Sequence, residues 1–300
     1  MIQLFGLQFN TLMDVLLVIT LVIIIGVGLL ALGNKIFFKI GVRNIPRRRT
    51  QMVLIVFALM LSTTLLSSVL ATGDVMTAAV QTVAIYNWGN VDEIIQGGQG
   101  TLGFYDDRIY YQLRSHVQDD PTIAAIGVSL TETGLLVADE TSRQVRSNVT
   151  GLGILNGTEQ GFGGMQELGS KNHLSTTQLG LNDVYLNQTA AQLLNARKGD
   201  TLYLYSQRWP GKRYVFHVSA IVQNGGLVGE LPYIVSRIEP FRQIEGRHDD
   251  ISQIFIENSG GGGVNGIGLS DYVSATLTRW LPGYTHVIEV KQQGVQDSQL

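Results

Sequence analysis

Side chains that could perform metal or nucleophilic chemistry are scattered along this 300-residue chain. The chain has no cysteine, which excludes disulfides, thiolate metal sites and a cysteine nucleophile. The five histidines form neither an HExxH motif nor a pair at metal-ligand spacing. They are His116, His173, His217, His248 and His286. His248-Asp249-Asp250 is the one local cluster of oxygen and nitrogen ligands, and we interpret it as a solvated turn. The sequence therefore predicts no metal centre.

One glycine-rich stretch invites a phosphate-binding interpretation. "GGGGVNGIG", residues 260–268, follows a predicted strand and precedes a predicted helix. It lacks the following Lys-Ser/Thr, and its glycines are in the wrong order for a dinucleotide fingerprint, so we interpret it as a flexible connector. The chain also lacks a Walker A motif and a GxSxG nucleophile elbow. We expect no enzyme activity, no cofactor and no P-loop binding of ATP.

The charged residues form a clearer pattern. Residues 34–51 contain six basic side chains and no acidic one. These are Lys35, Lys39, Arg43, Arg47, Arg48 and Arg49. The first three recur every four residues, which predicts a short helix at the membrane surface with its basic face toward the lipid headgroups. Pro46 should end that helix. Acidic residues outnumber basic ones beyond Gln51, which argues against nucleic acid as a partner.

Two long apolar runs flank this basic segment. They cover residues 12–32 and 52–71, and each has the roughly 20 residues that a helix needs to cross a bilayer. One alternative is a pair of buried helices in a soluble protein. Another is a cleaved signal peptide for the first run, but no Lys or Arg precedes it and its apolar core is too long. We predict a two-helix transmembrane hairpin, residues 1–73, anchored in the lipid bilayer.

The positive-inside rule sets the topology of this hairpin. The basic loop stays in the cytoplasm, so the N-terminus and residues 74–300 are extracytoplasmic. The predicted location is the plasma membrane, with more than one pass. Within the second span, Ser62, Thr63 and Ser67 are small and hydroxylated. Such residues either allow close helix–helix packing or return hydrogen bonds to their own helix, and the sequence leaves both open.

Residues 74–300 predict an α+β extracytoplasmic domain, built as one large unit or two smaller subdomains. Helices are expected over 106–117, from Asn187 or Thr189 to Arg197 with Gly199 as its end, and over 270–281. Pro240 is expected to interrupt a helical segment at 237–244, and residues 151–170 are expected to form a loop. The predicted strands are 123–130, 134–139, 144–149, 183–186, 200–206, 213–223, 251–258 and 285–292.

Several segments together resemble a known family. They are "RNIPRRR", the apolar span ending in "ATGD", "LNQTAAQLLNARKGDTLYLY", "YVFHVSAIVQNGG" and "ISQIFIENSGG". In this order, over residues 40–292, the chain resembles ABC transporter permeases of the FtsX-like, MacB type, with their periplasmic core domain. The resemblance implies a separate ATP-binding cassette ATPase as partner and allows a homodimer. The family has no span before the basic segment and has further membrane helices after the outer domain, so we expect a fragment or a split subunit.

The resemblance implies a function in transport. ATP hydrolysis by the separate ATPase would move the extracytoplasmic domain, for export or for extrusion of a lipoprotein or another substrate. The alternative is a two-span anchored extracytoplasmic sensor or assembly module without transport activity.

Overall fold

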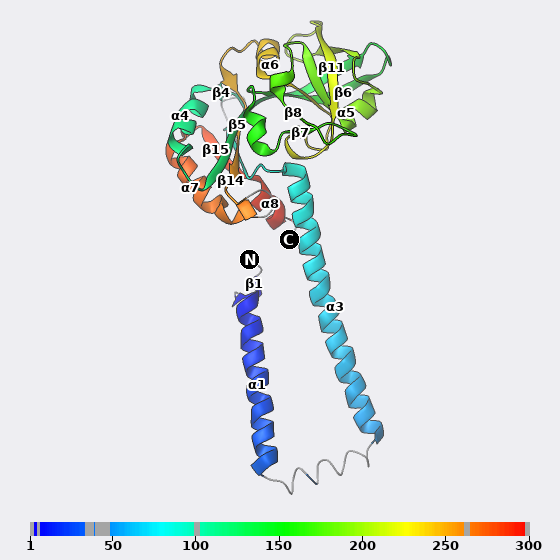
Figure 1. Ribbon diagram of the computed structural model, residues 1–300, viewed down its shortest axis with the longest axis vertical. Coiled ribbons are helices and arrows are strands. Elements are labelled where there is room, and N and C mark those ends of the chain that lie inside the picture. Colours follow the sequence, from blue (N-terminus) through cyan, green and yellow to red (C-terminus); the bar gives the residue numbers. More distant parts are fainter. Residues whose placement is uncertain are drawn as a thin grey trace. The chain divides into compact units, whose positions relative to one another are not determined.

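The computed structural model describes residues 3–4, 7–33, 39, 49–98, 103–260 and 265–297 (Figure 1). Residue contacts divide the chain into an N-terminal unit, Met1–Gly73, and a C-terminal unit, Asp74–Leu300. The N-terminal unit contains α1 (Phe9–Gly33), after a short antiparallel pair, β1 (Gln3–Leu4) and β2 (Leu7–Gln8). It also contains the first part of α3 (Arg49–Trp88), a helix of 40 residues through which the unit boundary passes.

One segment of α3 is long and apolar enough to cross a membrane. It runs from Thr50 to Val69, and none of its most apolar part is buried. A core helix of a soluble protein would bury much of its surface, whereas here Leu54 and Phe57 are both about two-thirds exposed. The apolar stretch described within α1, Leu17–Leu29, is shorter than a span requires. Among the described residues there is thus one candidate span, and the two-helix hairpin stays a prediction.

The C-terminal unit begins with a four-stranded antiparallel sheet in the order β15-β3-β14-β5. α4 connects β3 to β5, and α7 connects β14 to β15, so the chain order is that of a ferredoxin-like split β-α-β pair. The elements are β3 (Glu93–Gly97), α4 (Arg108–Val117), β5 (Ile123–Asp139), β14 (Gln253–Asn258), α7 (Ser270–Trp280) and β15 (Thr285–Glu289).

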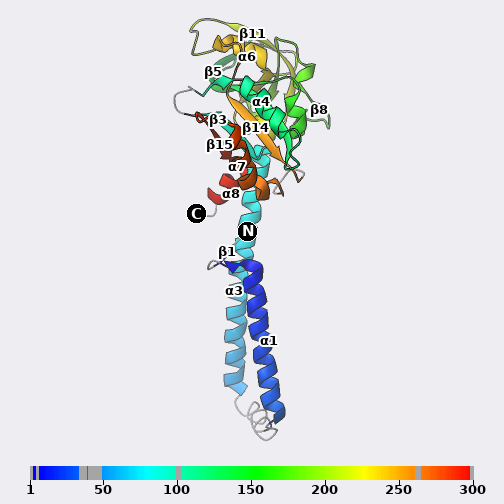
Figure 2. The same ribbon diagram turned by 90° about the vertical axis from the view of Figure 1, so that its left-hand side faces the viewer.

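Helices α4 and α7 lie side by side on one face of this sheet, as both views show (Figures 1 and 2). Leu113 of α4 and Leu277 of α7 belong to one buried cluster with Ile95 of β3. The rings of His116 and Trp280 stack between the two helices, with centroids 3.9 Å apart. Apolar residues at helical spacing therefore bury the inner side of both helices.

A second set of strands forms a closed ring. The order is β5-β6-β12-β9-β11-β10, and β10 pairs back onto the far half of β5. The ring is inserted between β5 and β14 of the ferredoxin-like sheet, and β5 belongs to both parts. Closure leaves this sheet without free edges. The further strands are β6 (Val145–Ile154), β9 (Asp183–Asn187), β10 (Thr201–Tyr205), β11 (Tyr214–Val222) and β12 (Tyr233–Arg237).

The remaining elements are short. α5 (Gln188–Leu194) and α6 (Ile238–Glu245) contact the ring strands, and α8 (Val290–Asp297) contacts β3. The small strand pairs are β4 (Tyr105–Asp106) with β13 (Asp250–Ile251) and β7 (Met165–Gln166) with β8 (His173–Leu174). The 3-10 turns are η2 (Thr158–Phe162), η3 (Thr176–Gln178), η4 (Gly226–Val228) and η5 (Asn265–Leu269). The unit thus mixes helices with largely antiparallel sheets, which confirms the predicted α+β class.

The predicted loop over residues 151–170 is wrong in its first part. β6 continues to Ile154, and its glycines lie against the ring of Phe241. A Cβ atom on Gly151 would come within 2.3 Å of that ring, so glycine here serves close packing and not a turn. Sequence patterns cannot separate these two uses of glycine.

Four further boundaries differ from the predictions. Residues 123–139 form one strand, in which Gly134, at φ +73°, allows a register shift. α5 ends at Asn195 in the left-handed conformation, well before Gly199. Pro240 lies in the first turn of α6, where its missing N–H is harmless, and does not interrupt the helix. The last strand stops at Glu289, and α8 follows directly.

Asn187 should contribute about 2 kcal/mol to the stability of the C-terminal unit. Its Oδ1 accepts from the backbone N–H of Ala190, which caps α5, and from that of Tyr233. We expect Asn187→Ala to lower the free energy of unfolding by about 2 kcal/mol, the upper end for a lost N-cap. Urea titration of the full chain in detergent would measure the change. The exposed Asn172→Ala should change it by less than about 0.5 kcal/mol. Equal effects of the two substitutions would contradict this prediction.

Candidate functional site

Most of the predicted basic cluster lies outside the described residues, namely Lys35, Arg43, Arg47 and Arg48. Lys39 is described and exposed, and Arg49 is the first residue of α3. The structure does not bring these side chains together at a described site. Their role in topology and at the membrane surface stays a prediction.

The predicted packing residues Ser62, Thr63 and Ser67 are all exposed on α3. The Thr63 hydroxyl donates within its own helix, to the carbonyl oxygens of Leu59 and Met60, each at 3.0 Å. This geometry favours hydrogen bonding within the helix for Thr63. Packing against another helix stays a prediction for all three residues.

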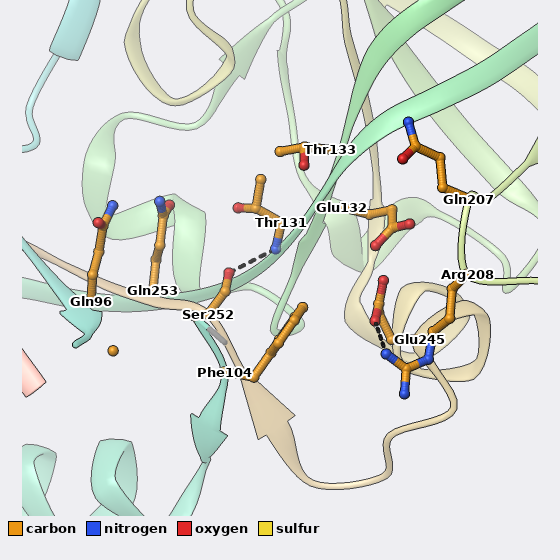
Figure 3. Close-up of a pocket in the computed structure, with 12 residues that line it drawn as sticks. Gln96, Phe104, Thr131, Glu132, Thr133, Gln207, Arg208, Glu245, Ser252 and Gln253 are labelled. Atoms are coloured by element: carbon orange, nitrogen blue, oxygen red, sulfur yellow. Dashed lines mark hydrogen bonds and ion pairs between the residues drawn. The ribbon is translucent and has the colours of Figure 1, made fainter. Parts of the chain in front are cut away.

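The C-terminal unit has an open cleft of about 580 Å³ where the four-stranded sheet meets the ring (Figure 3). β3, β5 and β14 supply one wall, and the segment after β10 and the end of α6 supply the other. Its described lining is mainly polar: Gln96, Gly97, Gly103, Phe104, Thr131, Glu132, Thr133, Gln207, Arg208, Glu245, Ser252 and Gln253.

Two buried carboxylates and one guanidinium dominate the electrostatics of this cleft. Glu132 is 6% exposed and Glu245 is 5% exposed. Ser206 Oγ donates to Glu132 Oε1 at 2.8 Å, and Arg208 Nη1 lies 3.3 Å from Glu245 Oε2. Burial raises the pKa of Glu132, against smaller lowering effects from Ser206 and Arg208. Figure 3 shows the two carboxylates pointing into the same part of the cleft.

The wall formed by β3, β5 and β14 also presents amides and hydroxyls. Gln96 and Gln253 are direct partners across β3 and β14, so their side chains stand next to each other. The Thr131 N–H donates to Ser252 Oγ at 2.8 Å, which fixes that hydroxyl. The Thr131 hydroxyl is buried and has no hydrogen-bond partner within the described ranges. The cleft can therefore supply both donors and acceptors to a bound molecule.

A second polar cluster, which we call the clasp, consists of Asp92, Glu93, Asn258 and Lys291. Lys291 Nζ, on α8, donates to Asp92 Oδ1 at 2.9 Å, and both side chains are at most 1% exposed. The Asn258 backbone N–H donates to Asp92 Oδ2 at 2.8 Å, and Asn258 Nδ2 donates to Glu93 Oε1 at 2.7 Å. The clasp joins the start of β3, the end of β14 and the start of α8.

No sequence motif pointed to the residues of the cleft or of the clasp. Glu132, Arg208 and Glu245 are far apart in the chain, as are Asp92 and Lys291. One signal for the clasp was available in the sequence, the pair Asp92-Glu93 at the start of an apolar strand. Adjacent carboxylates are unusual at buried positions. Among the described side chains, no group of three or more His, Cys, Asp or Glu could hold a metal ion.

Comparisons with known proteins yield structural neighbours only. No family model matches the chain, and no curated protein matches it in sequence. The periplasmic region of MacB from Actinobacillus actinomycetemcomitans is 13% identical at a TM-score of 0.46, covering 72% of this chain and 95% of that one. The extracellular domain of the ABC-type transporter YknZ from Gram-positive bacteria is 10% identical at a TM-score of 0.44, covering 66% of this chain and 100% of that one. Both TM-scores lie below 0.5, so we infer the function from the residues of this chain.

Proposed function

We propose that this chain is a membrane subunit of an ABC transporter, in which a separate ATPase drives movement of an extracytoplasmic C-terminal unit. The continuity of α3 carries the proposal. The helix begins at Arg49, includes the candidate span Thr50–Val69, and continues to Trp88. At about 1.5 Å per residue it is roughly 60 Å long, about twice the thickness of a bilayer core. One helix therefore serves as both span and entry to the C-terminal unit.

A tight turn leads from the end of α3 into the C-terminal unit. Gly89 follows the helix with φ +56°, and a Cβ atom there would lie 2.7 Å from Gly226 Cα. The Val91 N–H donates to the Trp88 carbonyl at 2.9 Å, and Val91 itself is buried. Asp92 and Glu93 of the clasp come next. Only residues 89–92 separate α3 from β3, so we expect a displacement of α3 to reach that strand.

A break in α3 tests this coupling. Thr72 lies between the span and the C-terminal unit, and its hydroxyl donates to the Ser68 carbonyl at 2.8 Å. Thr72→Pro removes a backbone donor and destabilises the helix by about 3 kcal/mol or more. We expect ATP to alter hydrogen–deuterium exchange in β3 of the wild-type chain, purified with its ATPase, and to leave it unchanged in Thr72→Pro.

Thr72→Ala is the matched control, because it removes only the side-chain hydrogen bond and alanine favours helices. It should respond to ATP as the wild type does. If the chain purifies from its native membrane without an ATPase, or if Thr72→Pro still responds fully, the proposal is wrong.

The polar cleft favours a second candidate function, a membrane-anchored sensor or binding module without transport. Clefts of this volume suit small ligands. Ligand binding by a chain that never associates with an ATPase would favour this candidate over the first.

A further inference from the structure

We propose that the cleft between the four-stranded sheet and the ring binds a small organic cation with a primary ammonium or guanidinium group. Glu132 and Glu245 would receive the cation, and the polar wall around Gln96 and Gln253 would receive the rest of the molecule. This inference does not depend on the transport proposal, because it concerns only the C-terminal unit.

The charge of the cleft lining is unbalanced. Its described residues include two carboxylates, Glu132 and Glu245, but one cation, Arg208. Arg247, which packs over the lining residue Phe104, has its own carboxylate partner, Asp250, and adds no net charge. The described lining thus carries one more negative charge than positive, and Glu132 itself is only 6% exposed. A buried carboxylate without a cationic partner is costly, and a ligand ammonium group would offset that cost.

The unbalanced negative charge lies on Glu132. Ser206 bonds only its Oε1, and Oε2 has no hydrogen-bond partner in the described part of the chain. That carboxylate is held rigidly, since Ser206 Oγ also accepts from the Arg208 N–H at 3.1 Å. Figure 3 shows the Glu132 carboxylate directed toward Glu245. An ammonium group between the two carboxylates could donate to both.

Arg208 does not fill this position. Its side chain is 43% exposed, and its contact with Glu245 is 3.3 Å long. An anionic ligand is disfavoured, because Arg208 is the only cation among the described lining residues and already has a carboxylate partner. The lining's amides and hydroxyls suit a polar molecule, and a cleft of about 580 Å³ accommodates one of tripeptide size.

Isothermal titration of the full chain in detergent with two amines tests the proposal. Spermidine carries ammonium groups alone, whereas the tripeptide Lys-Ala-Lys adds amides for the polar wall. We expect binding of Lys-Ala-Lys and its loss when the amines are acetylated. Glu132→Gln should weaken binding about tenfold or more, as expected for a charged hydrogen bond. Tighter binding of the tripeptide would identify peptide amines as ligands, and equal binding would identify free polyamines.

Substitutions at Arg208 and at Glu132 should change the affinity for amines in opposite directions. Arg208→Gln removes a competing cation and should tighten binding about threefold or more, whereas an anion site would lose affinity. Glu230→Gln, at an exposed carboxylate outside the lining, is the matched control and should bind as the wild type does. Thermal melts identify variants that fail to fold, and Glu245→Gln then replaces Glu132→Gln. The proposal is overturned if millimolar amine does not bind, if acetylated peptide binds equally, or if Arg208→Gln abolishes binding.

Discussion

Lys291→Met should lower the free energy of unfolding of the C-terminal unit by about 3–5 kcal/mol, the range for breaking a buried ion pair. Lys291 is 0% exposed and Asp92 is 1% exposed, so the substitution leaves a carboxylate that water cannot reach. Asp92 would keep the hydrogen bond from the Asn258 N–H. The methionine side chain fills a similar volume, so the loss reports charge and not a cavity.

Urea titration of the full chain in detergent, followed by tryptophan fluorescence, measures this loss, because all three tryptophans lie in the C-terminal unit. Adding Asp92→Asn to Lys291→Met should restore part of the stability, since it removes the orphaned charge. Lys198→Met is the control. Its side chain is 71% exposed and 3.9 Å from Glu167, so its removal should cost less than about 1 kcal/mol. Equal losses for Lys291→Met and Lys198→Met would contradict the buried pair.

The elements of the fold were predictable where local signals agreed with the tertiary structure. The capping side chain of Asn187 predicted the helix that follows it. The alternating pattern of residues 200–206 predicted the strand that the structure has at Thr201–Tyr205. The closure of the ring was not predictable. It depends on pairing the far half of β5 with β10, and strand pairing between distant segments leaves no local trace in one sequence.

The length of α3 shows a further limit of sequence patterns. The apolar run ends near Ala71, and Gly73-Asp74 is typical of a helix end. The helix nevertheless continues to Trp88, because one glycine costs only about 1 kcal/mol inside a helix. The cleft was hidden for a different reason. Glu132 looks like an exposed strand residue, and only the packing of Ser206 and Arg208 against it reveals a buried carboxylate.

Glu93 should make the wild-type chain less stable as the pH rises from about 4.5 to about 7. Burial raises the pKa of Glu93 from 4.5 to about 7, with smaller contributions from Ser270 and Asn258, which lower it, and from Asp92 and Glu289, which raise it. Glu289 is the direct cross-strand partner of Glu93, so two carboxylates face each other. The folded state therefore holds a proton that the unfolded state has released, and stability falls until Glu93 ionises in both states.

Glu93→Gln removes this pH dependence, because glutamine has the shape of the protonated acid and cannot ionise. At pH 5 the variant should be more stable than the wild type by less than about 1 kcal/mol. At pH 8 the variant should be more stable by about 3 kcal/mol, from about 1.4 kcal/mol per pKa unit. Urea titrations at both pH values measure the difference, and the exposed Glu230→Gln should show none. If the gap between Glu93→Gln and the wild type is the same at pH 5 and pH 8, Glu93 is already ionised at pH 5. The clasp would then hold two buried carboxylates against the single ammonium group of Lys291, and the interpretation of Glu93 as a neutral acid would be wrong.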